Sequence, residues 1–252
     1  MTATEPQWIE LDGAVNARVV VPGALLRSDN LQSLTPRDVR VLVDELGLEL
    51  VLDLRTDVEV AREGPGPLVA EPAVRIEHRS LYPDSGGMTD IDADTVLPWG
   101  HDAVDEDAGE PPAVRSYLSY LRRRPDSIVE SVRGIARARG GVLVHCAAGK
   151  DRTGVVVALA LDAVGVGRAA IVADYMVTAE RIEAIAGRLA ATDTYRAEIH
   201  GRDPRELAPL PGTMGRLLEL VDERHGGSVA WLRAHGLDED DLGRLRERLG
   251  GR

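Results

Sequence analysis

Residues 140–165 constrain the fold of this chain more than any other stretch. They read GGVLVHCAAGKDRTGVVVALALDAVG. A short apolar run typical of a buried strand is followed by a loop of small residues and then by a longer apolar run of helical length. This order indicates one strand-loop-helix unit of an α/β fold. The stretch also holds the only cysteine of the 252-residue chain, Cys146, and its only lysine, Lys150.

The flanking sequence extends the α/β prediction. Strands are predicted within 18–29, 48–55 and 74–81, the last two separated by a turn-rich segment. A helix is predicted to begin after the cap residue Thr35 and to stop at Gly47. Further segments have helical spacing: 113–124, 126–141 and, with breaks, 168–249. We therefore predict a central, mostly parallel sheet flanked by helices.

The chain shows no internal repeat and no clear linker, so we expect a single domain over 1–252 with a helical C-terminal part over 168–250. One segment interrupts the pattern. Between Asp84 and Glu110 lie seven Asp and two Glu without Arg or Lys. A long acidic segment of this kind is either a solvated insertion or a mobile cover over a site. A lid over about 84–115 is one of the two expectations.

Composition limits the partners. The formal net charge of −12 disfavours nucleic acid and anionic membranes, because these need a positive surface. The N-terminus has no basic region followed by an apolar run, and no apolar stretch is long enough for a membrane helix. A lone cysteine requires no oxidising compartment. We expect a cytoplasmic protein without membrane insertion, and leave open its oligomeric state and export without a signal peptide.

The loop after the predicted strand is suited to bind an anion. Ala147, Ala148 and Gly149 allow the backbone to curl so that successive N–H groups converge, and with Lys150 they form the predicted substrate-binding loop. The following helix adds the positive end of its dipole. Arg152 can grip two oxygens of the same anion with its guanidinium fork.

A cysteine at the edge of such a site is predicted to react as a thiolate, because N–H dipoles and cations favour the charged form. Cys146 could then attack the phosphorus of a bound phosphate ester. The leaving oxygen needs a proton, and the candidate donors are Asp151 and Asp84. Thr153 could donate a hydrogen bond to the sulfur.

The same residues allow other interpretations. Cys146 could be a small buried hydrophobe, and His145 either orients the loop or is a core histidine. The chain does not match the nucleotide-binding pattern G-x-x-x-x-G-K-[ST], since Asp151 follows Lys150 where Ser or Thr is required and Val144 stands in place of the first glycine. The scattered histidines form no metal-ligand pattern, so we expect no metal and no cofactor. A thiol-redox enzyme is disfavoured because no second cysteine exists.

The segment HCAAGKDRTG resembles the H-C-x-x-G-x-x-R-[ST]-G signature of the cysteine-dependent tyrosine and dual-specificity phosphatases. More narrowly, it is similar to the bacterial tyrosine and serine phosphatases of the mycobacterial protein tyrosine phosphatase B type. Other segments that look like this family are GALLRSDNLQSLT, VLDLRTDVEVAREGPGP, AIVADYMVT and GGSVAWLRAHGLDEDDLGRLRERL. The resemblance covers nearly the whole chain.

The resemblance implies a cysteine-phosphatase fold with Cys146 as nucleophile, Arg152 as phosphate clamp and Asp151 in proton transfer or in ordering Lys150. Asp84 falls where the family has a Pro-Asp implicated in acid catalysis. The family's helical lid would correspond to the acidic segment. Its early N-F-R-D-x-G-G pattern is reduced here to NARVVVPG, so the resemblance assigns no function to that segment.

We therefore expect a metal-free protein tyrosine phosphatase. Phosphoserine, phosphothreonine and phosphoinositides are further possible substrates, and a catalytically weak phosphate-binding module is the alternative. The resemblance to phosphoinositide phosphatases with a GKDR loop suggests that Lys150 holds an extra phosphate. A compact ammonium could instead pair with Asp151, or the lysine could have no special role.

Overall fold

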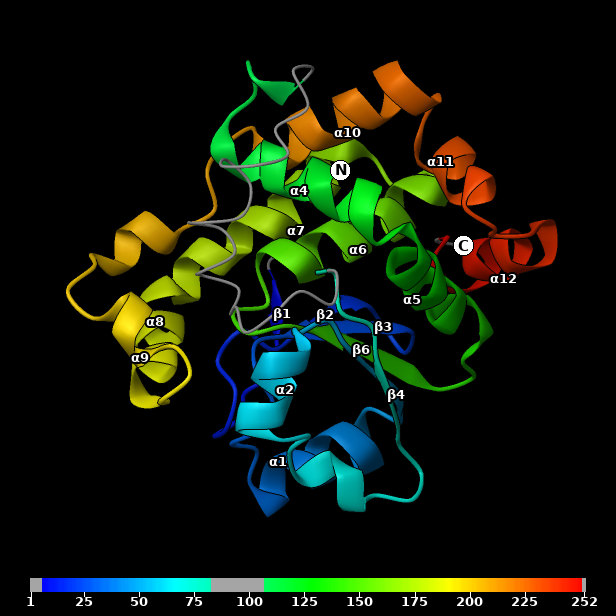
Figure 1. The fold of residues 1–252 in the computed structure, drawn as a ribbon. Coiled ribbons are helices and arrows are strands. Elements are labelled where there is room, and N and C mark those ends of the chain that lie inside the picture. Colours follow the sequence, from blue (N-terminus) through cyan, green and yellow to red (C-terminus); the bar gives the residue numbers. More distant parts are fainter. Residues whose placement is uncertain (1–5, 83–106, 251–252) are drawn as a thin grey trace.

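A six-stranded sheet forms the centre of the computed structural model, which describes residues 6–82 and 107–250 (Figure 1). The strand order is β1-β2-β3-β6-β4-β5. The pairs β3–β6, β6–β4 and β4–β5 are parallel, whereas β1–β2 and β2–β3 are antiparallel. The strands span β1 Gln7–Trp8, β2 Arg18–Val21, β3 Leu25–Ser28, β4 Leu48–Asp53, β5 Arg75–His78 and β6 Gly141–His145.

Strand β6 lies inside the sheet between β3 and β4, and all five of its residues are buried. Its side chains alternate between the two faces of the sheet, as a strand requires. Val142 and Val144 join the larger apolar cluster, whereas Leu143 points into the smaller cluster on the opposite face. A strand that is apolar on both faces is typical of a parallel sheet covered on both sides.

Helices cover both faces (Figure 1). The smaller cluster lies under α1 (Pro36–Arg40), its π-helical continuation Val41–Glu45, and the short helical turn Pro67–Ala70. The larger cluster is formed with α4, α5, α6 and the C-terminal helices. The remaining helices are α2 Asp57–Glu63, α4 Pro112–Arg123, α5 Pro125–Arg137, α6 Asp151–Ala163, α7 Arg168–Val177, α8 Ile182–Ala191, α9 Arg196–Ile199, α10 Thr213–His225, α11 Ser228–Ala234 and α12 Glu239–Leu249.

The predicted α/β fold with a mostly parallel sheet is confirmed. Thr35 caps α1 with its side chain, and Pro36 occupies the first turn. The segment between β4 and β5, described above as turn-rich, also forms α2 and a further helical turn, which were not predicted from the sequence. A capping box encodes α2, because the Thr56 side chain accepts a bond from Glu59 N while the Glu59 carboxylate accepts one from Thr56 N.

Most of the predicted lid, including Asp84, lies outside the described residues. At its C-terminal side, Asp107 is buried and accepts hydrogen bonds from Arg122 and Arg224. Within residues 6–82 and 107–250, no helix is long and apolar enough to cross a membrane.

Candidate active site

The loop between β6 and α6 lies at the carboxyl edge of the parallel strands. Cys146 directly follows β6 and is fully buried. Because β3 and β4 run parallel to β6 on either side, the segments that follow them reach the same edge. This is where α/β sheets place ligands, and where the sequence places Cys146.

The carbonyl groups of this loop are bound by donors from neighbouring segments. The Ala147 carbonyl accepts a hydrogen bond from the backbone N–H of Asn30 at 3.0 Å. The Ala148 carbonyl accepts one from the side-chain amide of Asn16 at 2.9 Å. Asn30 lies just after β3, so the loop is fixed to the end of the adjacent strand.

A third carbonyl, that of Gly149, accepts a bond from the guanidinium of Arg27 at 2.6 Å. In a planar trans peptide the N–H of the next residue points away from the carbonyl. The N–H groups of residues 148–150 therefore point away from these three donors. Successive N–H groups turned to one side form an anion-binding concavity, which is the geometry that the predicted phosphate loop requires.

A buried ion-pair network holds these donors in place. Asp174 on α7 accepts from Arg27 at 2.5 Å and from Arg18 at 2.9 Å. Arg18 also donates to the Asn16 side-chain oxygen at 2.6 Å. Burial, together with the neighbouring charge of Arg27, lowers the pKa of Arg18 to about 10, so Arg18 is still charged at neutral pH. The segment NARVVVPG, to which the resemblance assigned no function, thus helps to shape the loop.

Gly149 is required by the way the loop packs. Its φ is +67°, a left-handed conformation that glycine adopts without cost. A Cβ atom at this position would lie 2.3 Å from the carbonyl oxygen of Ser28. No other residue fits this position without moving the loop away from β3.

Arg152, in the first turn of α6, is oriented by a fully buried partner. Its guanidinium donates to the two carboxylate oxygens of Glu59 at 2.7 and 3.0 Å and to the Leu54 carbonyl at 3.1 Å. Both side chains have no exposed surface. Burial alone would raise the pKa of Glu59, but the charge and hydrogen bonds of Arg152 outweigh it and lower that pKa. The pair therefore stays ionised.

Tyr195 completes this arrangement from a segment far away in the sequence. It lies between α8 and α9, and its hydroxyl donates to Glu59 Oε1 at 2.6 Å. Burial and the negative charge of Glu59 raise the pKa of Tyr195 well above its usual value. The phenol thus remains a neutral donor.

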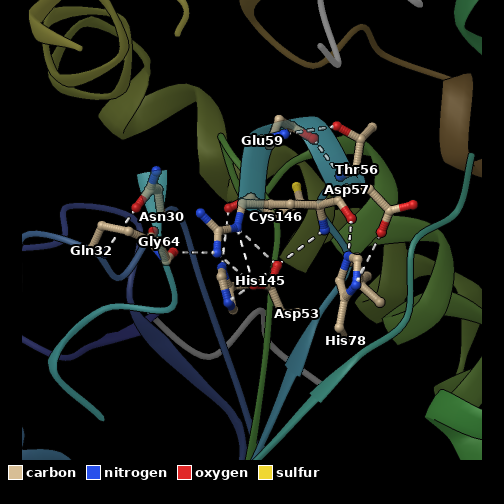
Figure 2. A network of polar contacts seen from close by, with 12 residues as sticks. Asn30, Gln32, Asp53, Thr56, Asp57, Glu59, Gly64, His78, His145 and Cys146 are labelled. Carbon is tan, nitrogen blue, oxygen red and sulfur yellow. Dashed lines mark hydrogen bonds and ion pairs between the residues drawn. The ribbon is translucent and has the colours of Figure 1, made fainter. Parts of the chain in front are cut away.

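A second polar network lies beneath the loop (Figure 2). Arg55 binds the Asp53 carboxylate, with Nη2–Oδ2 at 2.6 Å, and His145 Nε2 lies 3.6 Å from Asp53 Oδ1. Burial alone would raise the pKa of Asp53. The charges of His145 and Arg55 and the hydrogen bonds from Arg55 outweigh burial, so the pKa of Asp53 lies far below its usual range.

His145 Nδ1 lies 3.2 Å from the Cys146 carbonyl oxygen, and a carbonyl can only accept. The His145 ring therefore donates to the backbone of the cysteine. Desolvation by burial lowers its pKa to about 4 despite Asp53, which makes it neutral at physiological pH. These contacts fit the predicted orienting function better than proton transfer.

Asp151 and Lys150 lie side by side, as expected if the lysine forms an ion pair with this carboxylate. Lys150 Nζ is 3.3 Å from Asp151 Oδ2 and donates to the Leu207 carbonyl at 2.7 Å. Asp151 Oδ1 accepts a hydrogen bond from the hydroxyl of Tyr117. The ion pair is thus present, whereas an extra-phosphate site at Lys150 stays a prediction.

The functions expected of two further candidates, Thr153 and Asp84, stay predictions. Thr153 is buried, and its Oγ1 has no hydrogen-bond partner among the described residues, so the bond to the Cys146 sulfur stays a prediction. Asp84 lies outside the described residues. Two positions before it, the ring of Tyr82 lies 5.7 Å from Arg152 Cζ, so the described chain reaches the site at residue 82.

Sequence reasoning missed the residues that hold this site together. Glu59 could have been found, because Thr56 followed three residues later by Glu59 is a capping-box signature before an apolar run. Tyr117 and Tyr195 had no such signal, since their partners are 34 and 136 positions away in the sequence.

We predict that Gly149→Ala lowers the free energy of unfolding by about 2 kcal/mol or more, because the left-handed conformation and the contact with Ser28 both oppose a side chain. Gly187→Ala in α8 is the matched control: a Cβ there meets nothing within 4 Å, and alanine should stabilise the helix by about 0.5–1 kcal/mol. Urea unfolding of both variants tests the prediction, and changes of the same sign would contradict it.

The buried neutral His145 should make stability depend on pH. Between pH 6.5, its unfolded pKa, and about 4, its folded pKa, only the unfolded state binds the extra proton. The free energy of unfolding should therefore decrease as the pH falls through this window, by about 3 kcal/mol for this residue. Urea unfolding at pH 7 and pH 4.5 should show a smaller decrease in His145→Asn. Equal decreases in both proteins would refute the assignment.

Comparison with known proteins agrees with this geometry. Residues 11–251 match the tyrosine phosphatase family. The chain is 31% identical over 280 residues to "Triple specificity protein phosphatase PtpB" of Mycobacterium tuberculosis, with 97% of each chain covered. It is 29% identical over 248 residues to "Tyrosine-protein phosphatase" of Nostoc commune, with 94% of this chain and 78% of the relative covered. The chain therefore belongs to the tyrosine phosphatase family, and it is a cysteine-dependent protein tyrosine phosphatase.

Proposed function

We propose that this tyrosine phosphatase cleaves phosphate monoesters through a phosphocysteine formed on Cys146. The observation that supports this most is the loop whose three successive carbonyls are bound from outside. This supports a site in which the loop N–H groups and the N-terminus of α6 would bind one anion together. Arg152, held by Glu59, would clamp the same anion.

In the first step the Cys146 sulfur attacks phosphorus, an S–P bond forms and the ester P–O bond breaks. The leaving oxygen takes a proton from a carboxylic acid, for which Asp151 and Asp84 are the candidates. In the second step a water oxygen attacks phosphorus, and the sulfur leaves as a thiolate. The hydroxyl of Thr153, buried without a partner in the described structure, is suited to stabilise that thiolate, since a buried polar group gains most from a new partner.

Phosphotyrosine is the first proposed substrate class. Phosphoserine, phosphothreonine and phosphoinositides follow as further proposals, because one similar protein is called a triple specificity phosphatase. A cytoplasmic location belongs to the same proposal, since a reducing compartment keeps a lone nucleophilic thiol reduced. The contacts of Lys150 with Asp151 and the Leu207 carbonyl favour a structural function of this lysine over the binding of an extra phosphate.

Steady-state hydrolysis of an aryl phosphate in EDTA tests the mechanism. The wild type should turn over without added metal, whereas Cys146→Ser should be inactive because the thiolate nucleophile is lost. The variant should still bind inorganic phosphate, since the loop amides and Arg152 remain. Loss of wild-type activity in EDTA would contradict the metal-free mechanism. Phosphate binding without wild-type turnover would favour a weak binding module.

We predict that Lys150→Ala lowers kcat/KM by a similar factor on a phosphotyrosine peptide and on a phosphoinositide, because the ammonium already contacts Asp151 and the Leu207 carbonyl. Lys150→Arg is the matched control that keeps the charge but replaces the compact ammonium with a planar fork. A loss confined to the phosphoinositide would overturn this prediction and assign Lys150 to an additional phosphate.

A further inference from the structure

The Asp151 carboxylate is held at both oxygens by residues of different elements. Oδ1 accepts the hydroxyl hydrogen of Tyr117 from α4, and Oδ2 lies 3.3 Å from Lys150 Nζ. The Asp151 side chain is 12% exposed. Because the carboxylate is mostly buried and both of its oxygens are in contact with neighbours, it is held in one orientation.

Tyr117 is itself fixed on its other side. Its hydroxyl lies 2.8 Å from that of Tyr175 on α7, and the two rings meet edge to face at 6.5 Å between centroids. A phenol has one hydrogen to donate. Because Tyr117 gives its hydrogen to Asp151, Tyr175 must be the donor between the two phenols. The hydrogen bonds therefore run in one direction, from Tyr175 through Tyr117 to Asp151.

The sequence makes room for this arrangement. Gly154 lies in the first turn of α6, and a Cβ there would come within 3.1 Å of the Tyr175 ring and 3.2 Å of Met214. Glycine in a helix interior costs stability relative to alanine. That cost is offset here by the close packing of α7 on the turn that carries Asp151.

We propose that Tyr117 is a positioning residue: by engaging Oδ1 of Asp151 it makes Oδ2, which also faces Lys150 Nζ, the oxygen that exchanges protons with the substrate. The inference rests on the proposed function, with Asp151 as the proton donor. Tyr117 can donate to Oδ1 in both states of the acid, because the acid's own proton sits on Oδ2. The burial that raises the pKa of Tyr117 well above its usual value supports its action as a constant donor.

The proton balance follows from this assignment. As the S–P bond forms and the ester P–O bond breaks, the Oδ2 proton moves to the leaving oxygen, and Asp151 becomes a carboxylate. When water attacks the phosphocysteine, its proton returns to Oδ2 and the sulfur leaves with the S–P bonding electrons. Tyr117 keeps its own proton throughout and is therefore not itself an acid or base in the reaction.

The test compares kcat/KM over a series of aryl phosphates whose phenols differ in acidity. Proton donation matters most for poor leaving groups, and a positioned acid contributes about 10²–10⁴-fold. Tyr117→Phe should lose about tenfold more activity on the poorest leaving group than on the best, and Asp151→Asn should show a steeper dependence of the same sign. The double variant should be no worse than Asp151→Asn alone.

Tyr120→Phe is the matched control. It removes a buried hydroxyl from the same helix, one that lies 2.8 Å from the hydroxyl of Tyr82 rather than on Asp151. It should leave the leaving-group dependence as in the wild type. Tyr175→Phe provides a second route should Tyr117→Phe fail to fold: it removes the donor to Tyr117 and should steepen the dependence by a smaller factor.

The outcomes separate this inference from the proposed function. A wild-type dependence in Tyr117→Phe, or in Tyr175→Phe if only that variant folds, would overturn the positioning function while Cys146 catalysis stands. So would a wild-type dependence in Asp151→Asn, because Tyr117 would then have no acid to position. An inactive wild type would instead refute the proposed function itself.

Discussion

The buried ion pair of Arg152 with Glu59 is the interaction on which the rest of the site depends. A guanidinium without exposed surface stays charged, so a carboxylate must face it to offset the cost of burying that charge. Glu59 meets that need, and its geometry in turn requires α2, the capping box with Thr56 and the hydroxyl of Tyr195. Removal of one partner from such a pair costs about 3–5 kcal/mol, so the proposed phosphate clamp Arg152 and the packing of α2 form one structural unit.

The proposed phosphate site lies on a chain of strongly negative net charge and is not strongly positive itself. Five cations in the described part of the site each face a carboxylate: Arg18 and Arg27 share Asp174, Arg55 faces Asp53, Lys150 faces Asp151 and Arg152 faces Glu59. Attraction for a phosphate therefore depends on the oriented N–H groups of the loop and on the dipole of α6. Because these are fixed dipoles, the outer carbonyl contacts that orient them matter as much as any charged side chain.

The fold and the reactive loop were predictable from the sequence because they depend on local pattern. The apolar run of β6, the small residues 147–149 and the start of α6 are contiguous. The supporting residues were not predictable in the same way. Arg27 and Tyr195 contact the site through pairings 122 and 136 positions apart, which only the folded chain brings together. Glu59 is intermediate: its helix has a local signature, but its partner does not.

The distribution of aromatic residues follows from the same requirement. The chain has five tyrosines and no phenylalanine. Each tyrosine hydroxyl makes a hydrogen bond within or next to the site: Tyr82 with Tyr120, Tyr117 with Asp151 and Tyr175, and Tyr195 with Glu59. If these rings only filled space, phenylalanine would serve as well and would avoid the cost of burying a hydroxyl. Elsewhere the core is built mainly from aliphatic side chains, so tyrosine is used where a rigid ring must also carry a fixed hydroxyl, bonded either to a buried carboxylate or to another phenol.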